Sequence, residues 1–156
     1  MRKLIALAIF ALQSSISFGA GAAEPSSKKI TFVCEYGVAK SVIAEKYFNK
    51  LAKEQGLKYT AVSRGVTSKA ELQPATAVGL KEDGMDTSAF VPENLSEEDG
   101  ETSERVVLIG VEQVPGFLNK EKIVAWEGVP SVSKSYVAVR EDMIARIKQL
   151  IAELPK

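Results

Sequence analysis

Short apolar segments rich in β-branched residues alternate with amphipathic segments along most of this chain, and this alternation constrains its fold more than any other feature. Parallel strands need a long crossover between them, usually a helix, so the pattern predicts an α/β domain. We expect a three-layer sandwich with a four-stranded, mostly parallel sheet. The strands are predicted at residues 29–33, 58–63, 105–109 and 123–126.

The segments between these strands have apolar residues at helical spacing, or residues typical of helix ends such as Pro at the start and Gly after the end. Pro74 suits the first turn of a helix, because its missing N–H has no intrahelical partner there. The most polar stretch, residues 92–104, is predicted to be a surface loop with a short helix capped by Ser96. Longer helices are predicted at residues 41–55, 74–82 and 136–154.

The N-terminal segment is typical of a secretory signal peptide. Arg2 and Lys3 precede an apolar run over residues 4–12, and small residues in an Ala-x-Ala pattern follow. This run is too short for a membrane anchor, which needs about 20 residues. We therefore expect residues 1–23 to be removed, and residues 24–156 to form one domain that is exported to the periplasm or secreted and is not held at a membrane.

The composition excludes several kinds of site. The chain has one Cys and no His, which excludes Cys/His zinc clusters, Ser-His-Asp triads and Cys-His pairs. A single Cys also leaves no partner for an internal disulfide. The 20 basic and 20 acidic residues balance, so we expect no nucleic-acid partner. Any catalysis is expected to proceed without imidazole. For the anion-binding loop described next, we also expect no metal and no cofactor, since main-chain N–H groups and a lysine supply the positive charge.

Residues 34–41 lie between the first predicted strand and the first predicted helix, and they carry the candidate chemistry. Ligands of open α/β sheets bind at the carboxyl ends of the strands, and a loop entering a helix offers N–H groups to an anion. We predict that Cys34 is a nucleophile, that Lys40 supplies positive charge and that Ser41 stabilises the thiolate. The predicted oxyanion-binding loop consists of Glu35, Tyr36, Gly37, Val38 and Ala39.

This arrangement resembles the low-molecular-weight protein tyrosine phosphatases and the arsenate reductases that share their fold. Their pattern is Cys-x5-Arg-Ser after the first strand, and Cys34, Lys40 and Ser41 occupy the corresponding positions. The resemblance implies a Cys34 nucleophile and an oxyanion clamp at Lys40. It covers most of residues 29–154, with further landmarks at Ser63-Arg64-Gly65, Pro74, Gly84-Met85-Asp86 and the stretch from Trp126 to Pro130.

Two positions depart from the family pattern. The family's Arg is Lys40 here, and a Lys is a compact point charge rather than a planar fork of donors. The family also has an Asp, next to a Pro near the last strand, that protonates the leaving oxygen. In our interpretation Ser131 occupies this position, and Ser is a poor general acid near neutral pH. Glu127 is the alternative general acid.

The resemblance implies a phosphomonoesterase, a protein tyrosine phosphatase-like hydrolase that acts on a phosphate ester or another tetrahedral oxyanion. The N-terminal segment adds the expectation of export, and the two departures add the expectation of low activity. A first alternative is a catalytically impaired module that only binds phosphate or a similar oxyanion, because both departures fall on catalytic positions. A second alternative is an arsenate reductase-like thiol redox protein. The thioredoxin-coupled form of that chemistry needs further cysteines, and this chain has only Cys34.

Overall fold

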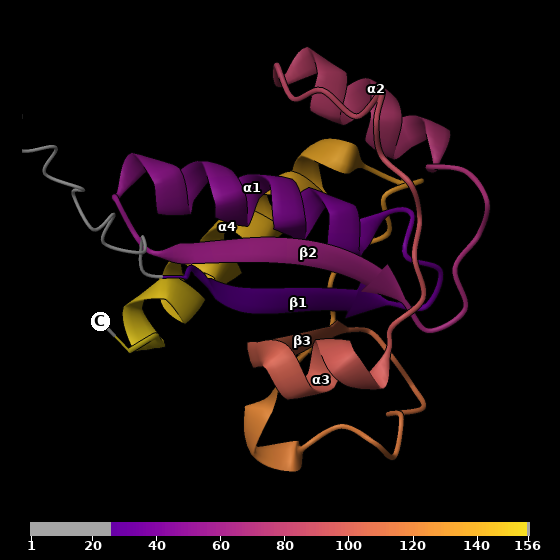
Figure 1. The fold of residues 1–156 in the computed structure, drawn as a ribbon. Helices are drawn as coiled ribbons and strands as arrows, with labels where there is room; N and C mark the ends of the chain where they lie inside the picture. The colour runs from indigo at the N-terminus through magenta and orange to yellow at the C-terminus, as the bar shows by residue number, and fades with distance from the viewer. Residues whose placement is uncertain (1–25, 156) are drawn as a thin grey trace, which may run out of the picture.

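A computed structural model describes residues 26–155, so the predicted signal peptide lies outside the described residues. Four strands form one sheet in the order β2-β1-β3-β4 (Figure 1), and each pairing is parallel. The parallel α/β fold predicted from the alternating segments is therefore confirmed. The strands are β1 (Lys28–Cys34), β2 (Tyr59–Gly65), β3 (Ser103–Ile109) and β4 (Ile123–Trp126).

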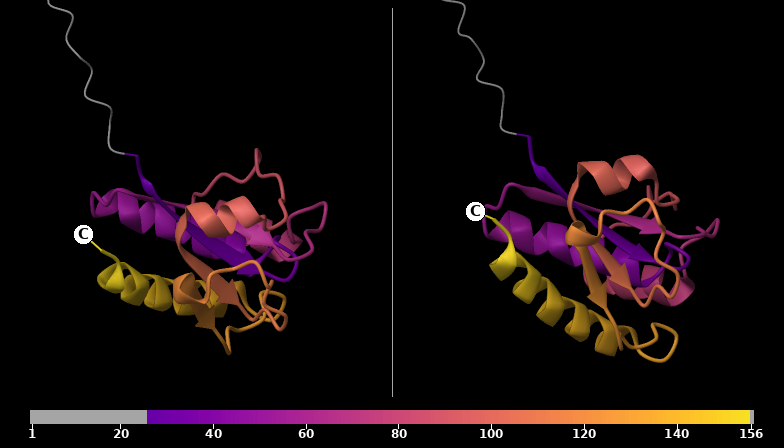
Figure 2. Two further views of the ribbon diagram at one scale, coloured as in Figure 1. Left: turned by 60° about the horizontal axis from the view of Figure 1, so that its bottom comes forward. Right: turned by 90° about the horizontal axis from the view of Figure 1, so that it is seen from below.

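Helices cover both faces of the sheet and complete the three layers. Figure 2 shows α1 and α4 side by side on one face, while α3 lies on the other. The predicted cap of α3 is present, because the Ser96 hydroxyl accepts from the Asp99 N–H and the Asp99 side chain accepts from the Ser96 N–H. The helices are α1 (Lys40–Glu54), α2 (Pro74–Glu82), α3 (Glu97–Thr102) and α4 (Tyr136–Glu153), and a single 3₁₀ turn spans Lys120–Lys122.

The central strand β1 is buried on both faces, which explains its continuous apolar run. Because side chains alternate along a strand, Ile30, Phe32 and Cys34 pack in the cluster beneath α1 and α4. Val33 joins a smaller cluster on the opposite face. The alternation thus places Cys34 at the carboxyl end of the sheet, on the face that α1 covers.

Asp83, directly after α2, joins three helices. Its carboxylate accepts hydrogen bonds from the hydroxyls of Tyr47 on α1, at 2.6 Å, and Tyr136 on α4, at 2.7 Å. Arg140 adds an ion pair at 3.0 Å. Burial alone would raise the pKa of Asp83, but these hydrogen bonds and the charge of Arg140 lower it. Burial and the nearby Asp83 raise the pKa of Tyr47 to about 12. This network fixes α2 against α1 and α4.

Asp99 has a similar role on the opposite face. Its buried carboxylate pairs with Lys29 of β1 at 3.0 Å and with Arg64 of β2 at 2.8 Å. Burial would raise the pKa of Asp99, but the hydrogen bonds from Arg64 and Lys29 lower it. Asp99 therefore holds α3 to two strands of the sheet.

Asp83→Asn should lower the free energy of unfolding by about 2 kcal/mol near pH 7, because a hydrogen bond to a charged group contributes roughly 1.5–3 kcal/mol. The pKa of Asp83 is lower in the folded state than its ordinary value of about 4, so its contribution is complete above about pH 4 and is lost as the pH falls through the folded pKa. Urea denaturation should therefore show a smaller difference in the free energy of unfolding between the unchanged protein and Asp83→Asn near pH 3 than near pH 7.

The matched control for this prediction is Glu82→Gln. Glu82 is the exposed neighbour of Asp83 at the end of α2, and exposed substitutions usually change stability by less than about 0.5 kcal/mol. Equal stability of Asp83→Asn and Glu82→Gln near pH 7 would contradict the role given to the Asp83 carboxylate.

Candidate active site

The predicted oxyanion-binding loop joins β1 to α1 at the carboxyl end of the sheet. Cys34 is the last residue of β1 and Lys40 is the first residue of α1. The structure therefore brings the loop and the N-terminus of a helix of 15 residues to one place, and this end of a helix carries partial positive charge.

The segment that follows β2 holds this loop by its carbonyl groups. The described peptide bonds are trans, so the C=O and the N–H of each peptide unit point in opposite directions. Where a loop carbonyl points toward this segment, the N–H of the next residue therefore points away from it. The N–H groups of residues 36–41 donate no hydrogen bond to any of residues 26–155. They are thus available to an anion. The anchoring bonds, of 2.9–3.1 Å, run from the N–H groups of Val66, Thr67, Lys69 and Gln73 to the carbonyls of Cys34, Glu35, Tyr36 and Val38, respectively.

Two glycines let the loop lie directly on the end of β2. Gly37 has a φ of +62°, in the left-handed region that glycine favours. A Cβ on Gly65 would lie 2.8 Å from the backbone nitrogen of Gly37, and equally close to the carbonyl carbon of Tyr36. The sequence placed Gly37 in the predicted loop and Gly65 among the family landmarks, but it did not indicate that the two backbones touch.

Cys34 and Ser41, predicted to act together, do lie together. The Cys34 Sγ and the Ser41 Oγ are 3.2 Å apart, and both side chains are buried. The hydroxyl is therefore within hydrogen-bond distance of the sulfur. Cys34 still lines the cleft described below, so its sulfur faces the space into which the loop opens.

Lys40 also lines this cleft, but its ammonium group already has a partner. Its Nζ donates to the carbonyl oxygen of Val129, in the segment after β4, at 3.0 Å. The structure thus places Lys40 beside the predicted loop with its charge directed toward the last third of the chain. Its role as oxyanion clamp stays a prediction.

The two residues considered as general acids lie in different places. Ser131 lines the cleft, and its Oγ is 2.8 Å from the Oγ of Ser133. Glu127 is exposed and is not among the residues that line the cleft. Of the two, only Ser131 shares the cleft with Cys34, and it offers a hydroxyl rather than a carboxyl group. Both general-acid assignments stay predictions.

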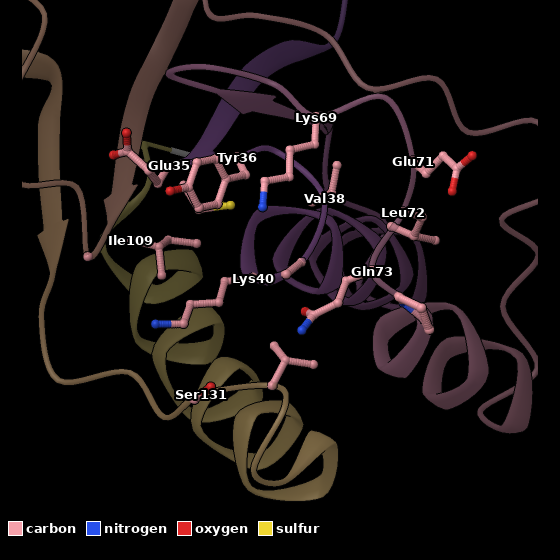
Figure 3. Close-up of a pocket in the computed structure, with 15 residues that line it drawn as sticks. Glu35, Tyr36, Val38, Lys40, Lys69, Glu71, Leu72, Gln73, Ile109 and Ser131 are labelled. Atoms are coloured by element: carbon pink, nitrogen blue, oxygen red, sulfur yellow. The ribbon is translucent and has the colours of Figure 1, made fainter.

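The cleft above the loop has a volume of about 620 Å³ and includes residues that the sequence did not indicate (Figure 3). Lys69, Glu71 and Gln73 of the segment after β2 line it, and so does Ile109 at the end of β3. The only sequence signal for the first group is its position directly before Pro74. Within residues 26–155, no group of three or more Cys, Asp or Glu side chains is placed to hold a metal ion.

Known proteins similar to this chain share its fold. The sequence model described as "Low molecular weight phosphotyrosine protein phosphatase" matches residues 29–122. The low molecular weight protein tyrosine phosphatase from T. tengcongensis is 26% identical, with a TM-score of 0.70 over 82% of this chain and 100% of that one. An arsenate reductase from Archaeoglobus fulgidus is 25% identical, with a TM-score of 0.62 over 80% and 99%.

A third solved structure extends this result. YfkJ from Bacillus subtilis is 23% identical and has a TM-score of 0.71 over 81% of this chain and 94% of that chain. None of the curated proteins compared with the sequence matches it significantly. At this identity the likeness to YfkJ concerns the fold alone.

Gly65→Ala should destabilise the protein by about 1–3 kcal/mol, because the added methyl group would press on the backbone of the loop, which cannot easily give way. Inorganic phosphate should also raise the melting temperature of this variant less than that of the unchanged protein, because the loop is displaced. Thermal unfolding with and without phosphate checks both effects. Gly116→Ala is the control, because a Cβ there meets nothing within 4 Å. Equal behaviour of the two variants would contradict the close contact.

Proposed function

This chain belongs to the low molecular weight phosphotyrosine protein phosphatase family, and on this premise we propose that it is a phosphomonoesterase whose nucleophile is Cys34. The observation that carries the proposal is the loop at residues 34–41. The N–H groups of residues 36–41 donate no hydrogen bond within residues 26–155. They adjoin Cys34, whose sulfur lies 3.2 Å from the hydroxyl oxygen of Ser41. Such a loop stabilises both a thiolate and a transferring phosphoryl group.

The proposed reaction has two steps. The Cys34 thiolate attacks phosphorus, an S–P bond forms, and the ester P–O bond breaks as the leaving oxygen takes its electron pair and gains a proton from water. Water then attacks the phosphocysteine, and the S–P bond breaks to give inorganic phosphate and the thiolate. The loop N–H groups and the N-terminus of α1 bind the negative oxygens throughout. Ser41 stabilises the sulfur each time it carries charge.

We expect slow turnover that depends strongly on the leaving group. Ser131 is the only general-acid candidate from the sequence that lines the cleft, and a hydroxyl gives up its proton poorly near neutral pH. Loss of a general acid typically costs about 10²–10⁴-fold in rate. Aryl phosphates, whose leaving groups need little protonation, are therefore the most favourable substrates.

One observation favours the alternative of a binding module without turnover. The Lys40 ammonium group donates one hydrogen bond to the Val129 carbonyl, and this bond restrains its movement toward a changing phosphoryl group. The arsenate reductase alternative has a different requirement. Cys34 is the only Cys in the sequence, so reduction of arsenate would need a second thiol from an external molecule.

Export is part of the proposal and rests on the sequence of residues 1–23, a basic start followed by a short apolar run and small residues. Within residues 26–155, none of the helices combines the length and the apolar character needed to cross a bilayer. We propose that the phosphatase works outside the cytoplasm.

The chain from Glu24 onward should hydrolyse p-nitrophenyl phosphate, and Cys34→Ser should lose the activity by at least about 10³-fold, because a hydroxyl is a far weaker nucleophile than a thiolate. Circular dichroism of both proteins controls for folding. Equal turnover in both would exclude Cys34 as nucleophile. A folded but inactive parent protein that still binds inorganic phosphate would favour the binding module, and arsenate reduction that requires added thiol would favour the redox alternative.

The full-length chain should lose its first residues during export. N-terminal sequencing of protein recovered from the envelope or medium of an expressing bacterium should give a start near Glu24. An intact Met1 on protein that stays in the cytoplasm would exclude the signal peptide.

A further inference from the structure

Two lysines line the cleft, and their ammonium groups differ in what they contact. Lys40 Nζ donates to the Val129 carbonyl at 3.0 Å. Lys69 Nζ lies 4.1 Å from the centre of the Tyr36 ring, and no carboxylate of residues 26–155 pairs with it. The Tyr36 side chain is 48% exposed, so this contact is at the mouth of the cleft.

The side-chain directions in the cleft concentrate positive charge inside it. Figure 3 shows the Lys69 side chain reaching into the cleft between Tyr36 and Val38, while the carboxylates of Glu35 and Glu71 point away from its centre. The N–H of Lys69 donates to the Tyr36 carbonyl at 3.1 Å, so the base of this side chain is fixed to the loop itself.

We propose that Lys69 supplies the mobile positive charge that binds the phosphate group over Cys34, while Lys40 mainly fastens the start of α1 to the segment after β4. This inference rests on the proposed function. It assigns the binding charge to a residue outside the Cys-x5-Lys-Ser pattern and gives Lys40, the residue within that pattern, a positioning role.

The energies of the two contacts support this division. An exposed cation–π contact contributes about 0.5–1 kcal/mol, so Lys69 leaves the Tyr36 ring readily when a dianion enters. A hydrogen bond between an ammonium group and an anionic oxygen is roughly twice as strong as a neutral one, so the exchange is favourable. The Lys40 ammonium group has two further N–H donors, but moving it away from Val129 to follow an anion would break a hydrogen bond to a carbonyl in a part-buried position.

The test measures anion binding without turnover. Because Cys34 is the only Cys, alkylation by iodoacetamide reports on this site alone, and bound inorganic phosphate should slow it. Lys69→Gln should raise the phosphate concentration for half-protection about five-fold, as expected for loss of one exposed ion pair. Lys69→Arg, which keeps the charge, should restore protection to within about two-fold of the unchanged protein.

Lys50→Gln is the matched control, because Lys50 is exposed on α1 and does not line the cleft. It should leave the half-protecting concentration unchanged. Lys40→Gln should lower the melting temperature more than Lys69→Gln does, because the Lys40 side chain donates a part-buried hydrogen bond, whereas the Lys69 side chain makes only an exposed cation–π contact.

Equal half-protecting concentrations for Lys69→Gln and Lys50→Gln would overturn the inference, and so would a loss for Lys69→Gln that Lys69→Arg does not reverse. The result is separable from the proposed function. Hydrolysis of p-nitrophenyl phosphate with unchanged protection in Lys69→Gln would reject the inference alone. A five-fold loss of protection in a protein without turnover would support the inference and reject only the phosphatase.

Discussion

The site depends on hydrogen bonds between two backbone segments. N–H groups of the segment after β2 bind the carbonyls of the loop after β1, and this leaves the loop N–H groups for an anion. The strand order makes the contact possible, because β2 lies next to β1 and both end at the same edge of the sheet. The close approach of Gly65 to Gly37 follows from the same pairing. An anion site is thus built from main-chain groups before any charged side chain takes part.

The sequence was sufficient for local features and for contacts between neighbours in the chain. Pro74 marks the start of α2 as predicted, and Ser96 caps α3. Cys34 and Ser41 meet because a short loop separates them. The bond from Lys40 to Val129 joins residues 89 positions apart, and the direction of a flexible Lys side chain cannot be read from its spacing. Lys69 was missed for a similar reason, since only the pairing of β2 with β1 brings it to the cleft.

The chain combines a family scaffold with a changed distribution of charge. The family match and the similar solved structures account for the sheet, the helices and the strand–loop–helix unit at Cys34. Lys40, predicted from the sequence to stand at the family's Arg position, is bound to a carbonyl, and Ser131, predicted to stand at the Asp position, lines the cleft with a hydroxyl. These changes leave the main-chain anion site intact and alter only the side chains around it. Changes in these side chains can therefore alter turnover in this fold while the main-chain groups that bind an oxyanion are kept.

The bond between Lys40 and the Val129 carbonyl also joins two distant parts of the chain that contribute differently to the site. The loop after β1 needs only the first half of the chain, because β1, β2 and the segment up to Gln73 supply its anchoring bonds. The opposite wall of the cleft is built from residues beyond β4, and joining the two closes a long stretch of chain at an entropic cost. The hydrogen bonds that anchor the loop thus connect residues up to Gln73, whereas the cleft above the loop also needs residues beyond β4. Removal of the residues beyond β3 would take away this wall and also α4, whose buried side chains belong to the same core cluster as Cys34.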